Sequence, residues 1–260
     1  MLSDDLRRQA ADDLMRADRD RSPITQLSTT HPDMDIVDAY AVQQYWAQAR
    51  VAAGARIVGH KIGLTSRAMQ QASNMTEPDY GFLTDDMVYD DGARIPANLF
   101  SKPRLEVELA FCLSAPLRGP GVRVHDVLRA TEYVIPALEI IDYRTEVPRT
   151  IVDTVADNAA AGAMVTGGRV VRPMDVDIRW VGATLSKNGI IEESGVSAAV
   201  MGHPAAGIAW LANKLALLDQ GLEAGELLLA GSFTRPVSVA AGDVVHADYG
   251  PLGSIAVSFT

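Results

Sequence analysis

The chain has 260 residues, with 33 acidic against 23 basic side chains and a net charge of −10 at pH 7. This length can bury a sizeable core, either in one large domain or in a small domain joined to a larger one. No run of lysine and arginine is long enough to follow a phosphate backbone, so we expect neither nucleic acid nor an anionic membrane as a partner, whereas a small anionic molecule fits.

Cysteine content and the N-terminus indicate the cellular compartment. Cys112 is the one cysteine, so no disulfide forms within the chain, and it follows apolar residues as a small buried hydrophobe would. The N-terminus is charged and lacks the apolar segment of a secretion signal, and no apolar run approaches membrane-spanning length. We therefore expect a soluble, cytoplasmic protein.

Two helices are predicted at the start of the chain. Apolar residues recur at helical spacing from Leu6 to Ala17, ahead of a break at Ser22-Pro23. The second helix begins at Asp35, which can cap it, and ends at Gly54.

Beyond Gly54 the pattern changes to that of strands. Strands are predicted at 57–63, 104–111, 184–192 with a hairpin turn at Asn188-Gly189, 226–232, 244–248 and 255–259. One further helix opens at His203-Pro204 and runs to Gly221. The chain shows no repeat and no linker. We expect an α+β fold, with an N-terminal helical lobe at 1–75 and a β-rich catalytic domain at 76–260 joined in one compact unit.

The most informative stretch is 104–111, where apolar and acidic residues alternate. On a strand, Glu106 and Glu108 share one face about 7 Å apart, while Leu105, Val107 and Leu109 form an apolar row on the other. Two carboxylates held side by side need a cation. The alternative is a solvated sheet face.

A third carboxylate, Glu139, lies inside the apolar run 134–141, where an unpaired charge is costly to bury. Its partner is then a lysine, an arginine or a divalent ion. Together with Glu106 and Glu108 it predicts one site for a hard metal ion. The five histidines show neither His-x-x-x-His nor His-x-His spacing, so the sequence gives little support for zinc.

Two further residues are candidates for proton transfer. Lys61 shares a strand face with Gly59 and Gly63, and we expect the glycines to leave room for a ligand beside it. A lysine buried near a metal can exchange protons near neutral pH, whereas a surface lysine on an edge strand is the alternative. Asp79 lies among turn residues, so it either supports the turn or takes part in catalysis.

Hydroxyl side chains lie at the end of the predicted strand at 226–232 and just after it. Ser232 and Thr234 share a face there and could bind a carboxylate, although strand propensity explains the threonine equally well.

With these residues in place, the chain resembles the fumarylacetoacetate hydrolase superfamily, and within it the branch of hydratases and decarboxylases that handles 2-oxo-enoates from aromatic meta-cleavage. The likeness spans nearly the whole chain. It is carried by residues 59–66, 77–81, 103–108, 133–139 and 155–159.

The resemblance implies a mixed, partly barrelled β-body with N-terminal helices. It places a metal triad for Mg²⁺ or Mn²⁺ on Glu106, Glu108 and Glu139, and an acid/base pair on Lys61 and Asp79. Three carboxylates leave about three positions of an octahedral ion open for a chelating 2-oxo acid and a water molecule. It also implies a homo-oligomer and association with neighbouring pathway enzymes.

The implied activity is a metal-dependent hydratase of homoprotocatechuate degradation, which adds water to 2-oxohept-4-ene-1,7-dioate, or its dienol, to give 4-hydroxy-2-oxoheptanedioate. Ser232, Thr234 and Arg235 would bind the substrate, with the arginine on its distal carboxylate, unless Arg235 is simply solvated. The alternatives are a 4-oxalocrotonate-type decarboxylase and a 2-hydroxypentadienoate hydratase. A non-catalytic partner subunit that binds 2-oxo acids is a rival of another class.

Overall fold

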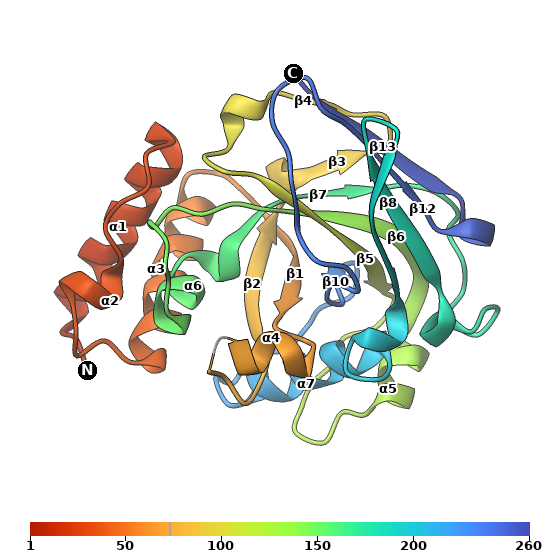
Figure 1. Ribbon diagram of the computed structural model, residues 1–260. Helices are drawn as coiled ribbons and strands as arrows, with labels where there is room; N and C mark the ends of the chain where they lie inside the picture. Colours follow the sequence, from red (N-terminus) through yellow and green to blue (C-terminus); the bar gives the residue numbers. More distant parts are fainter. Residues whose placement is uncertain (73) are drawn as a thin grey trace.

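The structure is a computed structural model that describes residues 1–72 and 74–260 (Figure 1). Two β-sheets form the body of the molecule. The N-terminal helices lie on one side of this body, and the last strands of the chain, drawn in blue, lie on the opposite side (Figure 1).

Three helices open the chain: α1 (Asp4–Asp20), α2 (Leu27–Thr30) and α3 (Ile36–Ala52). The side chain of Asp35 caps α3 by accepting hydrogen bonds from the first backbone N–H groups of the helix, as its position predicts. The apolar faces of the helices pack against α6 (Ile151–Ala156) and against Phe82 of the larger sheet. These contacts attach the helices to the β-body.

The larger sheet has eight strands and is mixed. Its spatial order is β2 (Asp79–Thr84), β1 (Ile57–Gly63), β10 (Leu227–Leu229), β5 (Arg104–Leu113), β6 (Thr131–Ile141), β7 (Ala161–Thr166) and β3 (Val88–Asp90), and β11 (Val237–Ser238) pairs with β5. β1 and β10 are parallel, as are β3 and β7, whereas the other pairs are antiparallel. The long strands β5 and β6 lie at the centre of this order.

The smaller sheet has five strands. Its spatial order is β4 (Arg94–Ile95), β13 (Ser254–Phe259), β12 (Val244–Asp248), β8 (Gly182–Lys187) and β9 (Ile190–Val196). β8 and β9 form the predicted hairpin, and the backbone φ angles of Asn188 and Gly189 are 53° and 82°. Positive φ at both central residues is what the Asn-Gly pair favours in this turn.

Helices α5 (Val124–Ala130) and α7 (Pro204–Ala216) pack against each other beside the sheets. His203 caps α7, which has its proline in the first turn as predicted. The helix ends at Ala216, before the predicted end at Gly221. The chain turns after the helix, and Asp219 takes a left-handed φ of 57° in that turn. The remaining elements are short: α4 (Arg67–Ala72), η1 (Asp85–Met87), η2 (Ala97–Leu99), η3 (Asn158–Ala160), η4 (Ile178–Trp180), η5 (Ser197–Ala199) and η6 (Gly250–Leu252).

The larger sheet curls on itself. Leu83 of β2, Ala110 of β5 and Met164 of β7 belong to one small apolar cluster on its inner face, although these strands are far apart in the spatial order. The other face of β5 packs into the main core between the two sheets. Mixed sheets, partial curling and N-terminal helices together confirm the expected fold class. Among the described residues, no helix combines the length and the apolar composition needed to cross a bilayer.

Candidate metal centre

The acidic pair of β5 lies on the inner face of the larger sheet. Leu105, Val107 and Leu109 are fully buried in the main core, so the alternation of the strand turns Glu106 and Glu108 to the opposite side. The predicted strand and its two faces are therefore confirmed.

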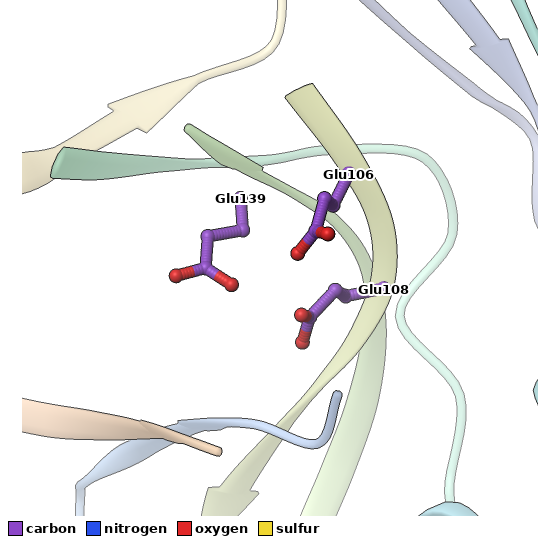
Figure 2. Close-up of side chains that lie close together, drawn as sticks. All are labelled: Glu106, Glu108 and Glu139. Atoms are coloured by element: carbon purple, nitrogen blue, oxygen red, sulfur yellow. The ribbon is translucent and has the colours of Figure 1, made fainter. Parts of the chain in front are cut away.

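Glu139 joins this pair from the neighbouring strand. In the antiparallel register of β5 and β6, Glu106 and Glu139 are direct partners. The three side chains converge on one region, as Figure 2 shows, and one carboxylate oxygen from each lies within 4.8 Å of the others. Two adjacent central strands thus supply all three carboxylates.

Burial raises the pKa of these carboxyl groups. Glu108 and Glu139 are 0% and 1% exposed, while Glu106 is partly exposed. Burial, followed by the nearby charge of Glu139, raises the pKa of Glu106 to about 8. The same two causes raise the pKa of Glu108 well above its usual range. Without a cation, therefore, this cluster holds protons more tightly than ordinary carboxylates do.

Several of the carboxylate oxygens accept no hydrogen bond from the protein, although Oε1 of Glu139 forms an ion pair with Lys61. One oxygen of Glu108 accepts a hydrogen bond from the Gly231 N–H at 2.8 Å. Within the described part of the chain, its other oxygen and both oxygens of Glu139 are buried without a hydrogen-bond partner. Carboxylate oxygens that converge from three side chains, with those of Glu108 and Glu139 largely free of hydrogen bonds, fit a hard divalent cation such as Mg²⁺ or Mn²⁺.

Lys61 of β1 reaches the same cluster. Its Nζ lies 3.1 Å from Oε1 of Glu139 and donates a hydrogen bond of 2.9 Å to the carbonyl oxygen of Ala159. The residue is 4% exposed, so it is not a surface lysine. Burial acts to lower the pKa of Lys61, but the negative charges of Glu139 and Asp79 outweigh it and raise the pKa. The side chain is therefore an ammonium group in the metal-free protein.

Asp79 begins β2 and lies opposite Gly63 of β1. A Cβ atom at Gly63 would lie 2.2 Å from Oδ1 of Asp79 and 3.1 Å from Nζ of Lys61, so the two side chains flank the same space. Asp79 is 2% exposed; burial raises its pKa, although Lys61 acts against that. The structure thus brings the predicted acid/base candidates together beside the carboxylates.

Gly59 and Gly63, which flank Lys61, have protein atoms and not open space beside them. The space at Gly63 is taken by Asp79, and a Cβ atom at Gly59 would lie 1.8 Å from the carbonyl oxygen of Leu227 on β10. The expectation that both leave room for a ligand is therefore wrong. They allow neighbouring protein atoms to approach β1 closely instead.

The hydroxyl groups after β10 bind to backbone atoms of β5. The predicted strand at 226–232 is shorter, ending at Leu229. Oγ1 of Thr234 accepts a hydrogen bond from the Val107 N–H at 3.2 Å. Oγ of Ser232 donates either to the Val107 carbonyl at 3.4 Å or to the Thr234 carbonyl at 2.9 Å. Both residues therefore lie next to the segment that carries Glu106 and Glu108, with their hydroxyl groups already hydrogen bonded.

Arg235 is not brought to the carboxylate cluster. Its side chain is 83% exposed and pairs with Glu193 at 2.8 Å. Recognition of a distal carboxylate by Arg235 stays a prediction.

Sequence reasoning missed two backbone groups of this site. The Gly231 N–H binds Glu108, and the Ala159 carbonyl binds Lys61. Every residue but proline carries such groups, so residue type gives no signal for them. Asp157, just before this carbonyl, is also buried, and it pairs with Arg144 and Arg149.

The chain is similar to known proteins over nearly its whole length. The profile of the family described as fumarylacetoacetate (FAA) hydrolase C-terminal matches residues 50–260. A 2-oxo-hept-4-ene-1,7-dioate hydratase of Escherichia coli is 52% identical over 253 residues, which cover 95% of each chain. A 2-keto-4-pentenoate hydratase of Paraburkholderia xenovorans is 40% identical and covers 97% of this chain, the match spanning 94% of the relative.

A solved structure of 4-oxalocrotonate decarboxylase from Pseudomonas putida G7, complexed with magnesium and adipate, superposes with a TM-score of 0.98. It is 36% identical, and the match covers 100% of this chain and 99% of that one. The matching profile spans most of the sequence, and relatives of high identity align nearly end to end. This chain therefore belongs to the fumarylacetoacetate hydrolase family.

Proposed function

We propose that this protein is a divalent-metal-dependent hydratase that converts 2-oxohept-4-ene-1,7-dioate, through its dienol, to 4-hydroxy-2-oxoheptanedioate in the meta-cleavage catabolism of aromatic compounds. The observation that carries the proposal is the cluster of Glu106, Glu108 and Glu139 beside the ammonium group of Lys61. The 52% identity to the hydratase of Escherichia coli favours this substrate over shorter ones.

Glu106, Glu108 and Glu139 would hold the metal ion through their convergent oxygens. Mg²⁺ or Mn²⁺ held there would supply a Lewis acid that the 2-oxo acid can chelate and that would stabilise negative charge on the substrate's 2-oxygen. Lys61 lies at the edge of the cluster, 3.1 Å from Glu139, so its ammonium group can donate a hydrogen bond to the same substrate oxygen.

Asp79 and Lys61 would move the protons of the reaction. As the 2-hydroxyl proton of the dienol leaves to solvent, the carboxyl group of Asp79 delivers a proton to C5. Its raised pKa suits it to hold that proton. Water then adds its oxygen to C4 and returns a proton to Asp79. Lys61 supplies the proton that C3 takes up and regains one from solvent, so atoms and charges balance.

Ser232, Thr234 and Arg235 would bind the far end of the substrate. The two hydroxyl residues lie along β5 next to the carboxylates, which supports a role near the substrate. For Arg235 the support is its position directly after this segment, and it would have to exchange Glu193 for the distal carboxylate. A guanidinium group is well suited to that exchange because it donates two parallel hydrogen bonds.

The second candidate function is decarboxylation. It is favoured by the TM-score of 0.98 to a 4-oxalocrotonate decarboxylase that binds magnesium and adipate. Both reactions would use the same carboxylates and the same stabilised 2-oxygen, so the metal site alone does not separate them. A 2-hydroxypentadienoate hydratase would catalyse the same addition of water on a substrate that has no distal carboxylate.

The test is to incubate the purified protein and Mg²⁺ with meta-cleavage dienoates of five, six and seven carbons and to identify the products by mass. A mass gain of one water on the seven-carbon diacid supports the proposal. Release of CO₂ from the six-carbon diacid, without hydration, would assign the decarboxylase. Binding of metal and oxalate with no turnover of any dienoate would assign a non-catalytic partner subunit.

We further propose a homo-oligomer that works in the cytoplasm and associates with neighbouring pathway enzymes. A groove of about 810 Å³ between α3 and α7, with Val51, Leu217 and Leu218 among its lining residues, supports self-association because such apolar surface is usually covered. The buried Cys112 thiol is consistent with a reducing compartment. Light scattering of the purified protein measures the oligomer size.

A further inference from the structure

The turn η3 after Asp157 has an unusual backbone. Asn158, Ala159 and Ala160 take positive φ angles of 50°, 50° and 61° in succession. A left-handed conformation costs an ordinary residue about 1–2 kcal/mol, and asparagine tolerates it better than alanine. Consecutive residues persist in it only where the surrounding structure holds them.

The side chain of Asn158 supplies one part of that restraint. Its Oδ1 accepts a hydrogen bond from the Phe82 N–H at 2.8 Å, and its Nδ2 donates one to the Phe82 carbonyl at 2.9 Å. Phe82 lies on β2, which ends the spatial order of the larger sheet. The amide therefore pairs with the free edge of β2 as a neighbouring strand would.

Gly81 allows the turn to lie this close to β2. A Cβ atom at Gly81 would lie 2.4 Å from the carbonyl oxygen of Asn158. Gly81 is also the register partner of Lys61 across the β1–β2 ladder. The same residue of β2 thus lies next to Lys61 on one side and next to the turn on the other.

The turn presents one carbonyl group to the site. The Ala159 oxygen accepts the hydrogen bond from Nζ of Lys61, whose other close partner is Glu139. These two contacts hold the ammonium group from two sides. The ends of the turn are held separately, by Arg144, which bonds to Asp157 and to the Ala161 carbonyl. Asn158 is the link between the turn and β2.

We propose that Asn158 is a positioning residue for Lys61: its amide fixes the left-handed turn to the edge of β2, and the Ala159 carbonyl then holds the ammonium group at the carboxylate cluster. This inference rests on the proposed function, in which Lys61 transfers protons. Among the described residues, the side-chain amide of Asn158 forms its hydrogen bonds with Phe82 and none with the carboxylate cluster.

The chain offers a matched control for this residue. Asn213 on α7 makes the same two hydrogen bonds with its side-chain amide, accepting from the Val122 N–H and donating to the Val122 carbonyl, each at 2.9 Å. Asn213→Ala therefore removes an equivalent pair of bonds outside the site. Asn158→Ala removes the pair at the turn, and Asn158→Gly removes it while keeping a residue that adopts positive φ without strain.

The experiment measures kcat, KM and Mg²⁺ affinity for these variants, alone and combined with Lys61→Met. We expect Asn158→Ala to lower kcat about 10- to 100-fold, because a small displacement of a catalytic group has such an effect. KM and the Kd for Mg²⁺ stay within about twofold, since the interactions that set ground-state binding are kept. Asn213→Ala keeps the wild-type kcat. In the Lys61→Met background, Asn158→Ala causes no further loss.

A second readout does not depend on turnover. In the metal-free protein, mass spectrometry follows the acetylation rate of Lys61, which we expect to rise at least several-fold in Asn158→Gly and to stay unchanged in Asn213→Ala. Should Asn158→Ala fail to fold, Asn158→Gly replaces it in every measurement. Equal losses of kcat with and without Lys61, or an unchanged acetylation rate, would overturn the inference. An inactive wild type would instead overturn the proposed function.

Discussion

Glu106 and Glu139 stand directly opposite each other across the antiparallel ladder of β5 and β6. Like charges in this arrangement destabilise a sheet, and here Glu139 is also buried while Glu106 is only partly exposed. Such a pair is costly for folding unless a cation or a proton offsets its charge. The site is therefore built at the expense of the stability of the metal-free protein.

Glu106→Gln is expected to stabilise the metal-free protein by about 1 kcal/mol, because the folded wild type must either protonate this carboxyl group or hold its charge opposite Glu139. It also removes a metal ligand, so stoichiometric Mg²⁺ binding and turnover are lost. Urea unfolding with a chelator, together with titration calorimetry, measures both effects. Glu132→Gln, at an exposed position of the same strand β6, should change neither. Near-normal activity with bound metal in Glu106→Gln would contradict the assignment of the site.

The stability of the metal-free protein is expected to fall as the pH rises from about 4.5 to about 8. The pKa of Glu106 is raised to about 8 in the folded state. A raised pKa means that the folded protein binds the proton more tightly, so the stabilisation is complete below the unfolded pKa and is lost as the pH passes the folded one. One group gives a slope below about 1.4 kcal/mol per pH unit. Urea unfolding at several pH values in this range, with and without Mg²⁺, measures the free energy of unfolding. A metal-free stability that stays constant or rises with pH would contradict the prediction.

Lys61→Met is expected to slow turnover by about 10² or more while metal and oxalate still bind, because it removes proton transfer and keeps most of the packing volume. Stopped-flow assays at saturating metal, with calorimetry for binding, separate the two effects. Lys102→Met, at an exposed position, is the control. A variant that loses metal affinity but keeps its turnover at saturating metal would show that Lys61 supports the metal site instead.

Gly63→Ala is expected to displace the carboxyl group of Asp79, since the added Cβ atom would lie 2.2 Å from Oδ1. We expect a loss of about 1–3 kcal/mol in stability, as for other overpacked sites, and a lower kcat. Gly182→Ala on β8, where the nearest atom to the added Cβ is 3.7 Å away, should be close to neutral. Circular dichroism and steady-state kinetics test both variants. A fully active Gly63→Ala would mean that the position of Asp79 is not critical.

Arg235→Leu is expected to lower kcat/KM for the seven-carbon diacid by about 10-fold or more, while 2-hydroxypenta-2,4-dienoate, which has no second carboxylate, is nearly unaffected. Arg56→Leu is the matched control, because Arg56 is also exposed and paired with an aspartate, Asp85. Equal losses of kcat/KM on both substrates would make Arg235 structural.

The metal cluster could be predicted from the sequence because its signal is local. A period of two places Glu106 and Glu108 on one face, and an acidic residue within an apolar run marks Glu139 as buried. The pairing of their strands was not predictable from this pattern. Register depends on contacts between residues far apart in the chain, and it is the register that places Glu139 opposite Glu106.

Close approaches between backbone segments were also beyond the reach of the sequence. Glycine next to Lys61 indicates that something lies close, but it does not say whether a ligand, a neighbouring strand or Asp79 fills the space. The left-handed turn at Ala159 gives little signal, because only Asn158 among its residues tolerates that conformation well. The division of the chain near residue 75 stays a prediction.

The single thiol of the protein lies on the same strand as two of the carboxylates. Cys112 is four residues beyond Glu108 on β5, is buried, and is the one cysteine in the sequence. A thiol reagent can modify it only when this part of β5 opens, so the labelling rate under native conditions reports how often the central strand is exposed. The labelling rate of Cys112 in the wild-type protein, measured with and without a bound cation, therefore shows how much the cation reduces the opening of β5.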